Sequence, residues 1–355
     1  MPEQDYLKDR FPRLSSQLSR MDLASLPTPV REHSIEYASI RRRLSIKYDN
    51  LTGSLYGGNK LRKLEYIFPR VKQRKCLRVA TFGAVGSNHA LATALYATQC
   101  GFECTCFLVH QAKCKEAAAT INKHIENGTE LVRYGGDYAT RIDTLRKHLH
   151  GRHAWVIPMG GSSWLGNIGF VAAGLELANQ VSRDEIPLPD RIYVGTGTMG
   201  TAVGIALGLS IAGMDSEVQA VRVSDTSIMN RDALKRLLEK TALMMRRLDD
   251  SVPSDLASRA NIRVRDEFFG PGYAKGTEQT EEAIGFARDA LDLSLETTYT
   301  GKAMAALLSD WRACGADQFN ALYWHTYNST PLDVPTDRPL DPTAIPGEFL
   351  RYFEA

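Results

Sequence analysis

Short apolar runs alternate with longer segments of helical periodicity from residue 76 onward. The runs that resemble strands, rich in β-branched and aliphatic residues, cover residues 76–82, 103–109, 129–134, 153–158, 191–195, 217–223, 261–268 and 320–325. The segments with a helical period cover residues 88–100, 140–150, 169–180, 202–213, 229–245 and 277–291. Strands that alternate with helices are typical of parallel βαβ units. The pattern predicts an α/β fold, and eight strands suggest two sheets.

The two ends of the chain depart from this alternation. Residues 33–50 predict a β-hairpin, which a glycine-rich turn joins to a helix that begins near residue 59. Pro69 is expected to end or restart that helix, because proline lacks the amide hydrogen of the helical ladder. Residues 331–346 contain five prolines and predict an extended tail, not a packed element.

Length and charge limit the classes of function. A chain of 355 residues exceeds the usual size of one hydrophobic core, so we expect two lobes. Lys and Arg number 43 against 41 acidic residues, which gives no reason to expect a nucleic acid as partner. No segment reaches the roughly 18 apolar residues of a membrane span, and the first residues resemble neither a secretory signal nor a transit peptide. We therefore expect a small metabolite as partner and the cytoplasm as compartment.

The six cysteines predict free thiols. They lack a paired CxxC pattern, and their density is far below that of a disulfide scaffold. Cys104 and Cys106 fall in an apolar strand pattern, where cysteine commonly fills a core. We expect no metal site.

Lys60 stands at a point where a lysine is unusual. Gly57 and Gly58 permit a close turn that delivers this one lysine to the start of a helix. The positive end of the helix dipole, with partial burial, lowers the pKa of an amine towards that of a nucleophile. Position alone still favours a structural explanation, since a lysine at a helix start is often simply solvated.

Two further turns join a strand to a helix. Residues 83–89 expose amide groups at a helix start, where Ser87 or Asn88 can act as the cap or a carboxylate can bind. Residues 195–201, GTGTMGT, are suited to cradle a phosphate. The latter also matches GxGxxG, and the next strand leads to Asp225. A nicotinamide dinucleotide site thus remains an alternative at this point.

Two tyrosines and the end of the last strand complete the candidate residues. Tyr273 and Tyr299 each lie in an expected loop beside a glycine-rich turn, where an aromatic ring can stack on a planar cofactor or move protons. Each is also a plausible packed anchor of its loop. His325 and Thr326 end the final strand, and ligands of open α/β sheets bind at such strand ends.

In this order, the motifs resemble the D-cysteine desulfhydrase and 1-aminocyclopropane-1-carboxylate deaminase family, pyridoxal-phosphate enzymes of the tryptophan-synthase-β type. The resemblance runs from residue 26 to residue 326 and rests on GGNKLRKLE (57–65), GSNH (86–89), GGSSWLGNIGF (160–170), GPGY (270–273) and YTGKAM (299–304). It implies fold type II, with two open, twisted, mostly parallel sheets flanked by helices and the cofactor between the lobes. We assign residues 1–62 and 165–355 to a larger cofactor-binding domain, with the tail at about 331–347, and residues 63–164 to a smaller inserted domain.

The resemblance also implies roles for residues. Lys60 would hold pyridoxal 5'-phosphate as an imine and later move protons. The residues expected to bind the cofactor beside it are Lys63, Asn88, Gly197, Thr198, Met199, Gly200, Thr201, Tyr299 and Thr326. Substrate binding would fall to Ser87, Asn88, His89, Ser162 and Tyr273, and catalysis to Lys60, Ser87, Tyr273 and Tyr299.

The family implies a small amino acid as substrate and a homodimer. Elimination of sulfide from D-cysteine is favoured over opening of the cyclopropane ring, because Thr300 and Thr326 replace a glutamate and a leucine of the deaminases near the pyridine nitrogen. Gly86 stands where the family usually has glutamine, and Tyr327 departs from the common HTGG. A protein that binds the cofactor with little turnover is therefore an alternative, and an NAD-dependent oxidoreductase is a weaker one.

Overall fold

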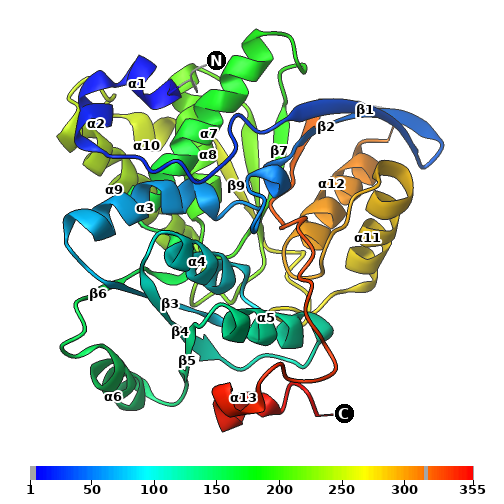
Figure 1. Ribbon diagram of the computed structural model, residues 1–355. Helices are drawn as coiled ribbons and strands as arrows, with labels where there is room; N and C mark the ends of the chain where they lie inside the picture. The colour runs from blue at the N-terminus through cyan, green and yellow to red at the C-terminus, as the bar shows by residue number, and fades with distance from the viewer. Residues whose placement is uncertain (1–4, 316–318, 355) are drawn as a thin grey trace.

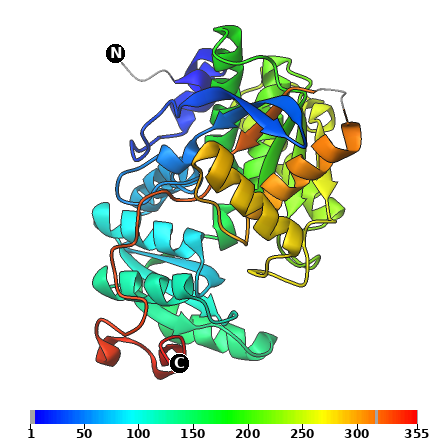
Figure 2. The ribbon, with the colours of Figure 1, turned by 90° about the vertical axis from the view of Figure 1, so that its right-hand side faces the viewer.

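The chain folds into two lobes, each built around its own sheet (Figures 1 and 2). The computed structural model describes residues 5–315 and 319–354. Residues 1–4, 316–318 and 355, which belong to the predicted larger domain, lie outside the described residues. Each of the eight predicted strands and six predicted helices overlaps an observed element of the same type, and the predicted two-sheet α/β fold is confirmed.

The large sheet has six strands, in the order β1-β2-β10-β7-β8-β9. The hairpin strand β1 is antiparallel to β2, as predicted, and the other neighbours are parallel. The bounds are β1 (Val30–Tyr37), β2 (Ile40–Lys47), β7 (Arg191–Thr196), β8 (Glu217–Arg222), β9 (Ile262–Arg265) and β10 (Ala321–Trp324). Because the last five run in parallel, their carboxyl ends meet at one edge of the sheet.

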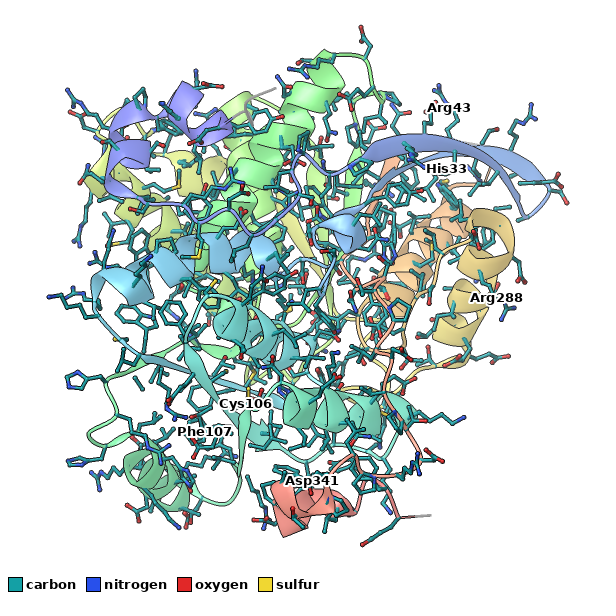
Figure 3. The ribbon with its side chains drawn as sticks, in the orientation of Figure 1. His33, Arg43, Cys106, Phe107, Arg288 and Asp341 are labelled. Carbon is teal, nitrogen blue, oxygen red and sulfur yellow. The ribbon has the colours of Figure 1, made fainter. Side chains whose placement is uncertain are left out.

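The small sheet has four parallel strands, in the order β5-β4-β3-β6. The bounds are β3 (Arg78–Ala84), β4 (Glu103–Val109), β5 (Glu130–Arg133) and β6 (Ala154–Val156). Figure 3 labels two neighbours on β4 that face opposite ways: Cys106 joins the core under α4 and α5, and Phe107 packs with Phe82 and Tyr134 towards α6. Strands covered on both faces explain the unbroken apolar run of β4.

Thirteen α-helices and three short 3-10 helices lie among the described residues. The α-helices are α1 (Tyr6–Arg10), α2 (Pro12–Gln17), α3 (Leu61–Gln73), α4 (Asn88–Gln99), α5 (Lys115–Glu126), α6 (Tyr138–Leu149), α7 (Trp164–Ser182), α8 (Gly200–Ala212), α9 (Arg231–Leu248), α10 (Leu256–Arg259), α11 (Glu278–Leu291), α12 (Thr300–Cys314) and α13 (Gly347–Leu350). The 3-10 helices are η1 (Asp49–Leu51), η2 (Met159–Gly161) and η3 (Pro342–Ala344). None of the helices in the described part of the chain has both the length and the apolar character that crossing a membrane requires.

Both faces of the large sheet are covered. On β7, Ile192 and Val194 pack against α7, α8 and α9, while Tyr193 between them packs against α11 and α12. This alternation follows from the two-residue period of a strand. The strands of each sheet fall within the domain ranges predicted above. The small-lobe core also contains Ala24 and Tyr56, although both belong to the range assigned to the larger domain. The domain boundaries therefore stay a prediction.

The prediction that Pro69 ends or restarts its helix was wrong. Helix α3 continues through Pro69 to Gln73. Proline cannot donate to the carbonyl four residues earlier, which is that of Glu65, but this carbonyl accepts a hydrogen bond from the amide of Met21 at 2.8 Å. A partner from the N-terminal segment thus satisfies the group that the proline leaves open.

The prediction of an unpacked tail was also wrong. The segment lacks strands, as its prolines require, but it passes beside α5 in the small lobe (Figures 1 and 2). The buried side chain of Asn122 on α5 donates to the carbonyls of Pro335 and Arg338 and accepts from the amide of Leu340. Ile345 then enters the small-lobe core. One amide side chain supplies the partners that a strand ladder would otherwise provide.

Candidate active site

The turn that carries Lys60 is held against the end of β10. The amide of Gly57 donates to Asn328 Oδ1 at 2.7 Å, and the amide of Asn59 donates to the carbonyl of Thr326 at 3.1 Å. Gly58 has φ +96°, and a Cβ there would lie 2.8 Å from the same carbonyl. Glycine is therefore required by both backbone conformation and space. The turn places Lys60 directly before the first residue of α3.

The amines of Lys60 and Lys63 enter the same cavity. Burial lowers the pKa of Lys60 to about 8, although the charge of Glu296 opposes this shift. Burial, and then the charge of Lys60, hold the pKa of Lys63 well below its usual range. Lys60 Nζ donates to Asn59 Oδ1 at 2.7 Å, and Lys63 Nζ donates to the carbonyl of Gly160 at 2.9 Å. Both prefer to be neutral or to meet an anion.

The loop Gly197 to Thr201 forms the start of α8 at the edge of this cavity. Met199 adopts a left-handed conformation with φ 65° at the N-cap position of α8. Its side chain makes no capping hydrogen bond to the helix. A Cβ at Gly200 would lie 2.5 Å from Ser162 Oγ and 2.9 Å from Lys63 Nζ. The glycine thus lets a lysine and a serine approach the positive end of α8, where an anion is stabilised.

Ser162 connects Lys63 to the loop Gly197 to Thr201, the two candidates for binding a phosphate. It does not line the cavity itself. Its hydroxyl accepts from Lys63 Nζ at 3.1 Å and from the amide of Gly200 at 3.2 Å, and it lies 2.8 Å from Thr198 Oγ1. The substrate contact of Ser162 stays a prediction. Its observed contacts position Lys63 and the loop.

Tyr273 and Tyr299 both line the cavity and lie side by side. Their hydroxyls lie 3.3 Å apart, and their rings are nearly perpendicular at 85°. Lys60 Nζ lies 5.9 Å from the centre of the Tyr299 ring. Burial raises the pKa of Tyr299 to about 12 and holds that of Tyr273 well above its usual range. Both hydroxyls remain protonated near neutral pH and can donate.

Ser87 and His89 reach the cavity from the small lobe. Ser87 caps α4, since its hydroxyl accepts from the amide of Ala90 at 3.3 Å. His89 Nε2 lies 2.8 Å from Thr81 Oγ1, and Nδ1 lies 3.4 Å from Thr93 Oγ1. Burial and the two nearby lysines hold the pKa of His89 well below its usual range. Ser87 can still donate its hydroxyl proton, whereas both nitrogens of His89 have partners in its own lobe.

Besides Ser162, three other predicted residues are not among those that line the cavity. Asn88 Oδ1 accepts from the Tyr56 hydroxyl at 2.8 Å, and Thr326 contributes its carbonyl to the turn of Lys60. The hydroxyl of Thr300 lies 3.0 Å from Glu296 Oε1 at the start of α12. The argument from Thr300 for a desulfhydrase therefore loses its basis.

Sequence reasoning missed several residues that line the cavity. Gln111 follows β4, and Ser224 follows β8, directly before Asp225, which the sequence analysis had considered only for a dinucleotide. The rule that ligands bind at the carboxyl ends of parallel strands could have found them. Lys275, on the loop that carries Tyr273, had no recognisable signal.

The assembled cavity has a volume of about 310 Å³ and is lined from both lobes. Lys60, Lys63 and Lys275 face it, and Asp225 is the one acidic residue among the described residues of its wall. The amine of Lys63 beside the start of α8 and the half-buried amine of Lys60 favour an anionic ligand, and the tyrosine pair adds flat aromatic surface. These residues fit pyridoxal phosphate, which joins a phosphate to an aromatic ring. In the described ranges 5–315 and 319–354, no cluster of three or more His, Cys, Asp or Glu side chains could hold a metal ion.

Comparison with known sequences gives two findings. A family model described as pyridoxal-phosphate dependent enzyme matches residues 21–319. The D-cysteine desulfhydrase of Salmonella paratyphi B is 30% identical to the chain over 312 residues, an alignment that covers 84% of this chain and 88% of that protein.

Comparison with solved structures agrees on the fold. The crystal structure of an ACC deaminase homologue superposes with a TM-score of 0.73 at 25% identity, covering 93% of this chain and 96% of that chain. The structure of maize serine racemase gives a TM-score of 0.58 at 18% identity, covering 93% of this chain and 96% of that chain. The latter likeness concerns the fold alone.

Proposed function

Because the chain belongs to the family of pyridoxal-phosphate dependent enzymes, we propose that it is a lyase that converts a small amino acid into a 2-oxo acid and ammonia. Its cofactor is pyridoxal 5'-phosphate, and its two mostly parallel sheets flanked by helices are those of fold type II. The observation that carries the proposal is the half-buried amine of Lys60, which has a lowered pKa and faces a cavity with two protonated tyrosines.

The cofactor's phosphate would be held at the start of α8. The loop Gly197 to Thr201 forms a helix start whose N-cap residue, Met199, makes no side-chain cap, although the amide of Gly200 donates to Ser162 Oγ at 3.2 Å. The amine of Lys63 lies beside this loop. A phosphate there would stabilise the charged form of Lys63, which burial otherwise disfavours. We retain Asn88 and Thr326 as proposed contacts of the ring, although neither lines the cavity.

Pyridoxal phosphate, when bound, supplies an electron sink for the bond-breaking step. The amine of Lys60, freed when the substrate amine takes its place, can accept the proton of the substrate's α carbon. The Tyr273 and Tyr299 hydroxyls stay protonated and can donate to a leaving group. The hydroxyl of Ser87, at the start of α4, would bind the substrate carboxylate.

D-Cysteine is the substrate that we propose first, because a relative with 30% identity is a D-cysteine desulfhydrase. Breaking its carbon–sulfur bond and adding water would release one sulfide, one pyruvate and one ammonia. Opening of 1-aminocyclopropane-1-carboxylate to 2-oxobutyrate and ammonia is the second candidate, and the structural neighbour described as an ACC deaminase homologue favours it. The dinucleotide alternative loses its support, since the matched family uses a different cofactor.

The test begins with the visible absorption of the cofactor-loaded protein. We expect a band that Lys60→Ala abolishes and that Lys235→Ala, at an exposed position on α9, leaves intact. D-Cysteine, L-cysteine and the cyclopropane amino acid are then supplied while sulfide and 2-oxo acid are measured. A missing band would refute the cofactor site. A normal band without 2-oxo acid from a wide panel of amino acids would favour a binding protein with little turnover.

Two further expectations belong to the same proposal. The family resemblance suggests a homodimer, and the balanced charge and sequence pattern suggest the cytoplasm. Analytical ultracentrifugation of the loaded protein would show a dimer mass, and a monomer at all concentrations would contradict the first expectation. Fractionation of the producing cells tests the second.

A further inference from the structure

Gln111 approaches the active site from a segment that no recognised motif includes. It lies two residues beyond the end of β4, while Gly86 lies two residues beyond the end of β3. Because β3 and β4 are parallel neighbours, the chain segments that follow them emerge side by side at one edge of the sheet. The amide of Val85 continues this pairing with the carbonyl of Val109 at 3.1 Å. The topology therefore brings Gln111 next to Gly86 and Ser87.

The side chain of Gln111 occupies the space that a side chain at position 86 would take. A Cβ on Gly86 would lie 3.0 Å from Gln111 Nε2 and 3.3 Å from Oε1. The amide of Gly86 donates to Oε1 at 3.0 Å, which fixes the orientation of the carboxamide. Among the residues that the structure describes, Nε2 of Gln111 donates only to the thiol of Cys114, at 3.6 Å. A thiol is a weak acceptor. A donor is thus left for a ligand.

The backbone of Gln111 is held by the C-terminal segment. The Tyr352 hydroxyl accepts from the amide of Gln111 at 2.9 Å and lies 3.1 Å from its carbonyl oxygen, to which it can donate. The same hydroxyl lies 3.2 Å from Nδ1 of His110. Tyr352 is buried in the small-lobe core, with Phe349 packed against the ring of His110. One buried hydroxyl therefore fixes this segment from both sides.

We propose that Gln111 is a substrate-binding residue that donates from Nε2 to the carboxylate of the amino acid, and that Tyr352 is the positioning residue that holds it there. Gln111 lines the same cavity as Lys60, Ser87 and Lys275, so the donor faces a site where an anionic group is stabilised. The inference rests on the proposed function, because it assigns a further contact to the same substrate. It makes the C-terminal segment a support of the active-site wall, which it does not itself line.

The decisive measurement uses the cofactor-loaded protein and needs no turnover. D-Cysteine, D-serine and the methyl ester of D-serine are titrated while the cofactor absorption is followed. Gln111→Met keeps the length of the side chain but removes the donor, and we expect about tenfold weaker binding of the free amino acids. Binding of the ester, which lacks the carboxylate charge, is expected to change less than twofold. Gln99→Met, at an exposed position on α4, is the matched control.

Tyr352→Phe tests the positioning role. It keeps the buried ring but removes the hydroxyl, so we expect KM to rise several-fold while kcat stays within twofold. Tyr138→Phe removes a hydroxyl from an exposed tyrosine in the same lobe and should leave both constants unchanged. A fall in kcat with unchanged KM would contradict positioning of a substrate contact.

The outcomes separate the two proposals. If the wild-type protein binds free amino acids and Gln111→Met binds them equally well, Gln111 is not a substrate contact and the proposed function stands. Equal weakening for acid and ester would mean that Gln111 shapes the cavity without binding the carboxylate. If no amino acid changes the cofactor absorption of the wild-type protein, both proposals fail.

Discussion

Replacing Lys60 by methionine should stabilise the cofactor-free protein near neutral pH. The amine has a pKa of about 8 in the folded protein, against 10.5 for an ordinary lysine. Below about pH 8 the amine is charged in both the folded and the unfolded chain, so the folded state bears the whole cost of a poorly solvated charge. Methionine fills a similar space without a charge and removes this cost.

The magnitude follows from the size of the shift. A decrease from 10.5 to about 8 corresponds to about 3 kcal/mol of stability. The amine faces a cavity that water can enter, so we discount this value and expect Lys60→Met to gain about 2 kcal/mol near pH 7. Between the two pKa values the unfolded chain binds more protons than the folded chain, so the stability of the wild-type protein rises with pH. The advantage of the variant therefore shrinks from about pH 8 upwards and is lost near pH 10.5.

The assay is urea unfolding of both cofactor-free proteins across this pH range. Lys235→Met removes an amine from an exposed position on α9, and we expect the free energy of unfolding to change by no more than about 0.5 kcal/mol. An unchanged or lower stability of Lys60→Met near neutral pH would refute the reasoning. An advantage that persists undiminished at high pH would show that it arises from packing and not from charge.

Three other predictions concern packing, anion binding and the tail. Gly208→Ala on α8 should lower stability by about 1–3 kcal/mol, because the new Cβ would lie 2.4 Å from a carbonyl oxygen of α7. Gly285→Ala on α11 has open space around it and should raise stability by about 0.5–1 kcal/mol. Thermal unfolding of the two variants measures both changes. Inorganic phosphate should raise the melting temperature of the cofactor-free wild-type protein, and it should raise that of the Lys63→Met variant much less. Equal increases for the two proteins would argue against Lys63 as a phosphate contact. Asn122→Ala should speed amide exchange in residues 331–345, since three backbone groups lose their partner, while unchanged exchange would place the anchoring elsewhere.

The layers of this fold were readable from the sequence because they depend on short-range periodicity. Strand β4 appears in the sequence as a short apolar run, and α4 appears as a segment of helical periodicity. Both observed elements overlap the ranges predicted for them. The placement of Lys60 was likewise local, since two glycines and a helix start lie within a few residues. Its chemical meaning came from the order of five motifs along the chain, not from its own position.

Other features depended on partners that lie far away along the chain. Helix α3 passes through Pro69 because the amide of Met21 satisfies the carbonyl that the proline leaves open. The tail packs because Asn122, some 200 residues earlier, binds its backbone. A local pattern carries no information about such partners, so the sequence predicted a break and an unpacked tail.

What the sequence by itself determined is the α/β layering, the helix start that presents Lys60 and the candidate phosphate loop, because backbone periodicity and turn chemistry act within a few residues. What only the tertiary structure decided is which side chains share the cavity. The burial that lowers the pKa of Lys60, the meeting of the two tyrosine hydroxyls and the approach of Gln111 to Gly86 all arise from strands and loops that are distant in sequence. Their proximity is fixed by parallel strand pairing and core packing, which no single segment encodes.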